Sequence, residues 1–428
     1  MSLLTFALRN ARFLAFGAFA GFFSSFGQTY VIALFNPEIR AAFSLTHFDF
    51  GLIYALATIA SGTCLIWMGR LIDHIDLRRY SVVATAALAT ACLLLSWSPT
   101  VIFLGLALFA LRLTGQGLMA HIGQTSMGRY FNRERGKAVS IAMTGAPLGA
   151  ASFPWIVVSL GALYGWRGTW LVFAIFVAVV VAPLMLWLLR GHGARHAAYV
   201  TGLSPPHGAD PAMAVVQQQW TRRDVLRDHR FYLAIPAILA PSFIVTGFFF
   251  HQLHIADQLG WSRAWVASTY IAYGGVTVVS ALIYGPLIDR FGAVRLLPIN
   301  LVPLGLSMLW FGLSGTPSVG LGFMVASGIT SGGTFTILGA LWAEVYGTKH
   351  LGAIRAFAAS LMVYSTAASP VSMGWLIDNG TGIAEIALLC LSYIVFGTFL
   401  VLFAYRENGI TSLRAFQASV SLLKKTRD

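Results

Sequence analysis

The sequence predicts an all-α integral membrane protein with twelve transmembrane helices arranged as two six-helix repeats. Three observations predict this fold: the apolar composition, a set of long apolar runs, and an internal repeat. Hydrophobic residues make up 57% of the 428 residues, charged residues only 10%, and the mean hydropathy is +0.75. A soluble domain carries roughly 25% charged residues. A chain so poor in charge cannot cover itself with a polar surface, and we expect lipid to be its solvent.

Twelve segments are long and apolar enough to cross a bilayer core, which takes roughly 20 residues of helix. They are residues 11–34, 48–68, 81–97, 101–125, 138–161, 168–190, 231–250, 263–284, 296–314, 319–342, 353–375 and 383–405. Their length and their lack of alternation exclude a transmembrane barrel. The domains predicted from them are an N-terminal half (1–190), a linker (191–230), a C-terminal half (231–405) and a cytoplasmic tail (406–428).

The two halves repeat each other at an offset of 216 positions. The matched pairs are Gly69 and Gly285, Leu71 and Leu287, Ile72 and Ile288, Asp73 and Asp289, Arg79 and Arg295, Thr114 and Thr330, Gly117 and Gly333, Tyr130 and Tyr346, and Gly136 and Gly352. An offset held over several separated places indicates a duplicated half. Parallel repeats of a helical membrane unit are typical of a transporter whose site lies between its halves.

Basic residues predict the orientation of the helices. With the N-terminus inside, the cytoplasmic segments hold 24 of the 28 Lys and Arg residues, and both termini are cytoplasmic. This bias, with attraction to anionic lipid headgroups, accounts for the net charge of +13. We therefore expect no nucleic-acid partner. The use of 24 Arg against four Lys, with abundant Ala and Gly, suggests a GC-rich bacterium, and hence its cytoplasmic (inner) membrane.

The linker divides into two parts. Its first part is rich in Gly and Pro and is predicted to be flexible. Its second part, 220–228, is predicted to be a short amphipathic helix on the inner leaflet. The linker serves either as a simple tether or as a coupling element between the halves.

Several motifs, taken with their places relative to the helices, resemble the major facilitator superfamily. They are Gly69-x-Leu71-x-Asp73 with Arg78 and Arg79, its second copy at Gly285, Arg112 with Gly115-Gln116-Gly117, Arg129-Tyr130-Phe131 with Arg133, Arg135, Gly136 and Lys137, the run Gly145, Pro147 and Gly149, and Gly165-Trp166-Arg167. The C-terminal pattern of Glu344, Tyr346, Gly352, Pro370, Gly374 and Asp378 is similar to that of bacterial monocarboxylate and oxalate/formate-type carriers. Those carriers usually hold a carboxylate with an arginine in helix 8, and here helix 8 from Ala264 to Gly285 contains no Lys or Arg.

The resemblance implies that the signature loops act as an inner gate. Asp73 is expected to face the positive N-terminal end of helix 11 across the boundary between halves. Arg70, Arg78 and Arg79 are expected to pair with it and with nearby acids, Glu344 among them. The other loop positions assigned to the gate are Gly69, Arg133, Arg135, Gly285, Asp289, Arg290 and Arg295. Alternatively, these charges only fix the topology.

Arg112 is the charged residue expected near the bilayer midplane. It lies eleven residues into helix 4, about 16 Å deep. A charge at this depth costs at least ~2.5 kcal/mol, so it is expected to face a wet cavity and to serve a function. The alternatives are an anion anchor, a switch coupled to a proton, or a structural arginine bound to backbone carbonyls. No Asp or Glu lies at comparable depth, which favours an anionic or neutral solute over a cation.

Other polar side chains lie at mid-depth in helices expected to line the cleft. The substrate-binding candidates, with Arg112, are Gln28, Thr29, Gln116, Thr246, Tyr270, Tyr273, Thr330, Thr334 and Tyr364. Each of them alone is also consistent with a hydrogen bond between helices. The proton-coupling candidates are Arg112 and His121, because histidine titrates near physiological pH. Helices 6 and 12 are almost free of polar residues at mid-depth and are expected to face lipid.

The sequence predicts neither a metal site nor a cofactor. His251 and His254 stand three residues apart at the outer end of helix 7, but a third ligand cannot be assigned to them. Cys64, Cys92 and Cys390 all lie in apolar runs and are expected to be buried without disulfides.

We therefore expect a secondary transporter that is a monomer. Its expected partners are a small-molecule substrate, membrane lipid, and a proton or counter-substrate. The substrate is expected to be a small organic anion moved by alternating access. Two alternatives are efflux of amphipathic compounds by proton antiport and a membrane sensor that does not transport. The sequence shows no nucleotide-binding loop or catalytic triad pattern, so an enzyme is not expected.

Overall fold

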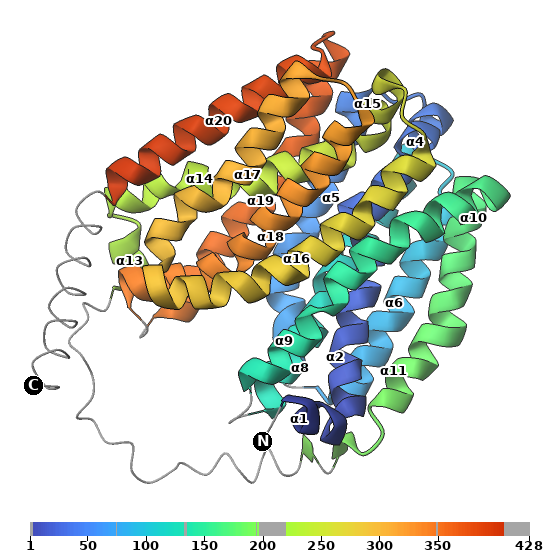
Figure 1. Ribbon diagram of the computed structural model, residues 1–428. Coiled ribbons are helices and arrows are strands. Elements are labelled where there is room, and N and C mark those ends of the chain that lie inside the picture. The colour runs from blue at the N-terminus through green and yellow to red at the C-terminus, as the bar shows by residue number, and fades with distance from the viewer. Residues whose placement is uncertain are drawn as a thin grey trace, which may run out of the picture.

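The computed structural model describes residues 3–73, 75–131, 135–193, 195–196, 220–347 and 350–405, and these residues form a bundle of helices without strands (Figure 1). We call the end that carries α1 (Leu3–Arg9) and α13 (Arg222–Val225) the inner end, because its loops are those predicted to be cytoplasmic. The opposite end carries α4 (Asn36–Phe43) and α15 (Gln252–Leu259), and we call it the outer end.

The N-terminal half holds six spans, several of them built from more than one piece. Its elements after α1 are α2 (Ala11–Phe23), η1 (Ser24–Gly27), α3 (Thr29–Ile32), η2 (Ala33–Phe35), α4, α5 (His47–Met68), η3 (Gly69–Asp73), α6 (Leu77–Trp97), α7 (Val101–Leu111), η4 (Arg112–Met119), α8 (Ala120–Tyr130), α9 (Arg135–Met143), α10 (Gly145–Phe176), η5 (Val177–Val181) and α11 (Ala182–Leu188). The C-terminal half is more regular. Its elements after α13 are α14 (His229–Phe250), α15, α16 (Arg263–Phe291), α17 (Ala293–Leu313), α18 (Pro317–Tyr346), α19 (Leu351–Asp378) and α20 (Ile383–Ala404).

These elements match the twelve predicted spans. Nine helical stretches of the described chain are long and apolar enough to cross a membrane, and a tenth is the pair Ala11–Gly27 and Thr29–Phe43, bent by 44°. One stretch, Lys137–Leu188, holds 52 residues and breaks at Gly165, whose φ is 64°. This break falls between the predicted fifth and sixth helices and divides the stretch into two spans. The 28-residue α19 is the predicted eleventh helix.

Polar side chains fix where several spans begin. The Thr46 hydroxyl accepts from the Asp49 amide, and the Asp49 carboxylate accepts from the Thr46 amide, which forms a capping box at the start of α5. Asp76 accepts from the amides of Arg78 and Arg79 and so begins α6. Such caps satisfy amides that have no partner within the helix.

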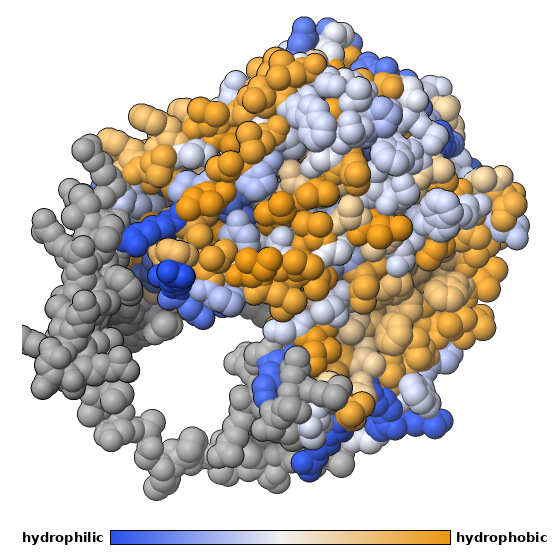
Figure 2. All heavy atoms as spheres, viewed as in Figure 1, coloured by the Kyte–Doolittle hydropathy of each residue, from blue (hydrophilic) through white to orange (hydrophobic). Residues whose placement is uncertain are grey.

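Lipid-facing surface explains the many exposed apolar side chains. Figure 2 shows apolar residues covering the middle of the face in view, with hydrophilic residues gathered toward the ends. On α20, Phe399 and Phe403 expose 66% and 63% of their surface, and Val179 on η5 exposes 66%. These residues belong to the predicted sixth and twelfth helices. The chain is therefore an integral membrane protein of all-α fold.

The two halves meet along two pairs of helices, α5 with α19 and α10 with α16. Glycines permit close contact at both. A Cβ on Gly51 would lie 2.7 Å from the Pro370 carbonyl oxygen, and one on Gly274 would clash with the Pro147 carbonyl oxygen. Backbones therefore touch directly at these two crossings.

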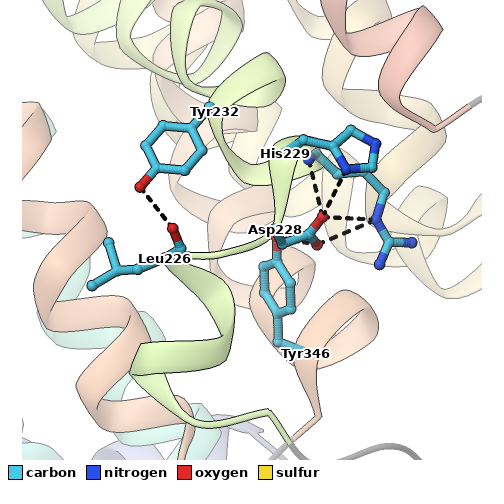
Figure 3. Close-up of polar contacts among 6 residues, drawn as sticks. Leu226, Asp228, His229, Tyr232 and Tyr346 are labelled. Carbon is cyan, nitrogen blue, oxygen red and sulfur yellow. Dashed lines mark hydrogen bonds and ion pairs between the residues drawn. The ribbon is translucent and has the colours of Figure 1, made fainter.

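The end of the linker packs on the C-terminal half. The Trp220 amide donates to the Tyr346 carbonyl at 3.1 Å, and Val225 in α13 is 1% exposed. Asp228, which caps α14, binds Arg230 Nε at 3.2 Å and accepts from the Tyr346 hydroxyl at 3.2 Å (Figure 3). The predicted amphipathic segment is thus a four-residue helix anchored to protein. Residues 197–219 of the linker and the tail 406–428 lie outside the described residues.

Candidate functional site

Two breaks in helix geometry occur where spans 1 and 4 cross. Span 1 is interrupted at Gln28, which is extended at φ −80° and ψ 148°. Span 4 changes to a π-helix from Arg112 to Met119. The crossing is close because Gly27 and Gly115 face each other, and a Cβ on either would clash with the other helix. Irregular backbone at membrane depth is tolerated where it is buried in protein or lines a wet cavity. Such breaks often mark functional sites.

A cavity of about 190 Å³ lies beside this crossing, between the two halves. Its lining residues come from spans 1 and 4 of the N-terminal half and from spans 7, 8, 10 and 11 of the C-terminal half. They are Gln28, Thr29, Tyr30, Arg112, Gln116, Pro241, Ser242, Val245, Thr246, Phe249, Tyr273, Ser331, Thr334, Phe335, Met362 and Thr366. Seven predicted substrate-binding residues are among them: Gln28, Thr29, Arg112, Gln116, Thr246, Tyr273 and Thr334. The structure therefore brings together predicted residues up to 306 positions apart in the sequence, from Gln28 to Thr334.

Arg112 is the one charged residue among these lining residues, and it is 2% exposed. Its Nη1 donates to the Gly27 carbonyl at 3.2 Å and to the Thr29 hydroxyl at 3.5 Å. Its guanidinium carbon lies 5.1 Å from the centre of the Tyr54 ring. The Gly27 carbonyl stands at the break in span 1, so Arg112 supplies the hydrogen bond that the broken helix lacks.

These contacts leave part of the guanidinium unused. Its Nε is buried and finds no acceptor among the described residues, and no carboxylate is recorded as an ion-pair partner for it there. A buried charge without an opposite charge is costly. The site is therefore suited to an anionic group, which would supply both the missing charge and an acceptor.

The C-terminal side of the cavity is polar but neutral. The Tyr273 hydroxyl reaches the Ser331 hydroxyl at 3.5 Å, and the Thr334 hydroxyl accepts from Asn300 Nδ2 at 2.9 Å. Asn300 also donates to the Thr330 carbonyl at 3.1 Å and is 0% exposed. Sequence reasoning missed Asn300, although a lone asparagine within the apolar run 296–314 was a signal that could have found it.

Three predicted substrate-binding residues do not line this cavity. The Tyr270 hydroxyl donates to Gln252 Oε1 at 2.8 Å, and the Thr330 hydroxyl donates to the Asn300 carbonyl at 3.1 Å. Tyr364 exposes 49% of its surface. The first two join helices to each other, which is the alternative that the sequence had left open for such residues.

His121 lies at the signature loop, not at the cavity. Its Nε2 is 3.0 Å from the Gly69 carbonyl oxygen, and a Cβ on Gly69 would meet the same imidazole at 3.4 Å. Next to it, Arg129 Nη1 donates to the Ile72 carbonyl at 2.9 Å. Residues of span 4 thus bind the inner end of span 2, and both spans belong to the N-terminal half.

The other gate residues also contact their own half. Glu344 accepts from the Ala293 amide at 2.6 Å, and Arg78 Nε donates to the Leu189 carbonyl at 3.3 Å. The amide of Arg79 binds Asp76, Asp289 is exposed, and the guanidinium of Arg290 lies 5.2 Å from the Phe291 ring. Arg295 lies in the first turns of α17. Arg133 lies outside the described residues, as do the side chains of Arg70, Asp73 and Arg135.

The halves are joined at the outer end. Asn36 Nδ2 donates to the Phe250 carbonyl at 3.0 Å, and Gln252 Nε2 donates to the Tyr30 carbonyl at 3.1 Å. Asp378 accepts from the amides of His47 and Phe48 at 3.2 and 2.7 Å. An ion pair between Arg263 and Glu38 completes this set of contacts. We call the outer seam these nine residues and the imidazoles of His251 and His254, which pack against His47. The nine are Tyr30, Asn36, Glu38, His47, Phe48, Phe250, Gln252, Arg263 and Asp378.

The inner ends differ. In Figure 1 the inner ends of α16 and α18 lie apart from those of α8 and α9. A Cβ on Gly285, in the second signature loop, would meet nothing within 4 Å. Among the described residues, the hydrogen bonds and the ion pair that join the halves thus lie at the outer end.

No group of three or more His, Cys, Asp or Glu with the geometry of a metal site is found among the residues that the structure describes. Cys64, Cys92 and Cys390 are free thiols.

Comparison with known proteins identifies the fold. The model of the Major Facilitator Superfamily matches residues 17–283 and 237–424. The chain belongs to the Major Facilitator Superfamily. Membership of this superfamily points to a secondary transporter rather than an enzyme. No curated protein matches the chain.

The chain is also similar in fold to a solved structure, that of a bacterial homologue of the human lysosomal transporter Spinster in an inward-facing and unoccupied conformation. The identity is 14%, the match covers 93% of this chain and 97% of that one, and the TM-score is 0.64. At this identity the likeness concerns the fold alone, and the narrower resemblance to monocarboxylate and oxalate/formate-type carriers is not confirmed.

Proposed function

We propose that this superfamily member transports a small organic anion by alternating access. The observation that carries the proposal is Arg112, the single charged side chain among the described lining residues of the cavity, with an unpartnered Nε. In a desolvated site a guanidinium binds a carboxylate strongly and in a defined orientation. A cationic substrate would meet a like charge there and no acid to hold it.

The size of the cavity supports a small solute. Sites for drug-sized ligands hold ~300–1,000 Å³. The cavity of about 190 Å³ falls below that range, which favours a compact anion over the amphipathic compounds of the efflux alternative.

Alternating access is supported by the uneven contacts between the halves. The outer seam is closed, while the hydrogen bonds of Glu344 and Arg78 to described residues lie within their own halves at the inner end. We infer that the signature loops join across the inner end in the outward-facing state. Asp73→Asn is expected to lower transport without loss of protein from the membrane, and unchanged transport would contradict the gate.

The experiment is a thermal-stability panel on purified protein with small carboxylates, neutral sugars and amphipathic cations. A ligand that binds the folded state raises its stability in proportion to occupancy. A carboxylate should stabilise the wild type and the control Arg223→Ala, whose arginine is exposed in α13. It should not stabilise Arg112→Ala. Stabilisation by amphipathic cations alone would overturn the proposal in favour of efflux.

Two further measurements distinguish a loss of binding from a loss of the fold, and a transporter from a sensor. Arg112→Lys keeps the positive charge but loses the planar guanidinium that binds a carboxylate through two hydrogen bonds, so it should bind carboxylate weakly. This variant remains informative even if Arg112→Ala, which also loses the hydrogen bond to Gly27, does not fold. Flux of the stabilising carboxylate into proteoliposomes distinguishes a transporter from a sensor, because a sensor would bind the ligand without moving it.

A further inference from the structure

The outer seam contains three imidazoles that transport by Arg112 does not use. His47 begins α5 in the N-terminal half, and His251 and His254 belong to the outer end of span 7 in the C-terminal half. The ring of His47 lies 4.5 Å from that of His254 and 5.5 Å from that of His251, centre to centre. The sequence analysis identified only the pair His251 and His254, because His47 lies about 200 positions away in the chain.

These imidazoles are removed from water. His47 and His251 are 8% and 2% exposed, and His254 is partly buried. Nδ1 of His47, Nδ1 of His251 and Nε2 of His254 are buried without a hydrogen-bond partner among the described residues. The remaining ring nitrogen of His251 lies 3.1 Å from the Pro370 carbonyl oxygen in α19. A further proton on this cluster would therefore have no acceptor in the closed seam.

Of the charges around the cluster, Arg40 and the neighbouring imidazoles oppose protonation, whereas two carboxylates favour it. Arg40 of α4 faces all three imidazoles, and each imidazole also faces at least one other. Asp378 of α19 faces His47 and His254, and Asp257 of α15 faces His254. Asp378 already accepts hydrogen bonds from two amides at the start of α5, so its negative charge is shared between these amides and the imidazoles. Burial, with smaller effects of the neighbouring imidazoles and Arg40, lowers the pKa of His251 to about 3 despite the opposing hydrogen bond to the Pro370 carbonyl. Burial with Arg40 lowers the pKa of His254.

We propose that His47, His251 and His254 form a proton-binding site that controls the outer seam. The imidazoles are neutral while the seam is closed, and they bind protons from the outer solution when the halves part. Bound protons place like charges on both sides of the seam and so prevent its closure. The proton must leave before the seam closes again, which makes the site a sensor of outer pH and not a carrier of the transported proton.

The size of the effect follows from linkage. A histidine that is neutral in the closed state, and has the usual pKa of about 6.5 in the open state, favours closure above pH 6.5 and loses this effect as the pH falls. Between pH 7.5 and 5.5, each such histidine should raise the ratio of open to closed seam about tenfold. The three histidines together would raise it up to about a thousandfold.

The inference rests on the alternating access proposed above, but its test needs no substrate. Spin labels on Ala42→Cys and Ser318→Cys, at exposed outer positions of α4 and α18, report the distance between the halves in nanodiscs. The background carries Cys64→Ala, Cys92→Ala and Cys390→Ala. Distances are measured by pulsed electron paramagnetic resonance at pH 7.5 and 5.5, and the population with the longer distance should be larger at the lower pH. A chelator is present throughout so that trace metal cannot contribute.

The matched variants are His47→Gln, His251→Gln and His254→Gln, singly and combined. The combined variant should lose the pH response, and each single variant should lose part of it. His229→Gln, whose imidazole is 81% exposed at the inner end, should keep it. If the combined variant does not fold, the single variants decide. A pH-independent distance in the wild type, or a full response in the combined variant, would overturn the proton site. Either result would leave carboxylate binding at Arg112 untouched.

Discussion

The crossing of spans 1 and 4 and its repeat-related region in the C-terminal half have diverged in charge. At the offset of 216, Thr114 corresponds to Thr330 and Gly117 to Gly333, but Arg112 corresponds to Gly328. The N-terminal half uses a buried cation to bind the break in span 1. The C-terminal half uses the neutral amide of Asn300 to join spans 9 and 10. Duplication therefore gave two similar scaffolds, of which one holds a charge at the cavity and the other holds neutral polar groups.

The largest expected effect is on carboxylate affinity, and it tests the charge that Arg112 places at the cavity. Arg112→Ala should lower carboxylate affinity by about 2–5 kcal/mol, the usual cost of removing one partner of a buried charge pair. Affinity is measured by titration calorimetry with the carboxylate found by the stability panel. Gln116→Ala, at the same cavity without a charge, serves for comparison and should lose far less. Equal losses in the two variants would show that the charge of Arg112 is not what holds the carboxylate.

The second prediction concerns the scaffold of the neutral half. Asn300→Leu removes two hydrogen bonds at a fully buried site and leaves the Thr330 carbonyl and the Thr334 hydroxyl without that donor. We expect a loss of about 1–3 kcal/mol in stability, seen as a lower melting temperature. The preference for anions over neutral solutes should remain. If Asn300→Leu abolished that preference, the neutral half would also determine charge selection.

The third prediction concerns the close helix crossing in the charged half. Gly27→Ala places a methyl group against span 4 and should destabilise the protein by about 1–3 kcal/mol through overpacking. Gly275→Ala in α16 is the matched control, because a Cβ there meets nothing within 4 Å. In a helix interior that change should be neutral or stabilising by up to about 1 kcal/mol. Similar melting temperatures for the two variants would contradict the tight crossing.

The smallest expected effect lies on the neutral wall of the cavity. Tyr273→Phe removes a hydroxyl that faces Ser331 and should weaken substrate binding by about 0.5–1.5 kcal/mol. Tyr364→Phe changes a residue that does not line the cavity and should leave binding unchanged. Dissociation constants of the two variants separate these expectations, and a larger loss in Tyr364→Phe would indicate a different substrate path.

The fold was predictable from the sequence because lipid selects continuous apolar helices. The twelve runs and the break near Gly165 needed only local composition. The lining of the cavity was predictable in part, since polar residues at mid-depth in the right helices are few. Which of them face the cavity depends on the rotation of each helix. Tyr270 and Thr330 face neighbouring helices, and no local pattern specifies that rotation.

Features that join distant segments were beyond sequence reasoning. The meeting of His47 with His251 and His254 requires the start of span 2 to lie against the end of span 7. The interruption at Gln28 and the π-helix at Arg112 depend on the Gly27 and Gly115 crossing, and neither segment has a helix-breaking proline. Tertiary contacts, and not local propensity, determine these departures.

The glycine crossings at Gly51 and Gly274 have a consequence for the rate of transport. Side chains that interdigitate must leave their rotamers before two surfaces can rotate, and this raises the barrier to rotation. At these crossings a bare backbone lies against a carbonyl of the opposite half, so little has to be disengaged. In the proposed alternating access, the halves would therefore rotate about these two points at low cost. The energy that separates the two states is then concentrated at the ends of the bundle, where a few polar groups determine how long each orientation lasts.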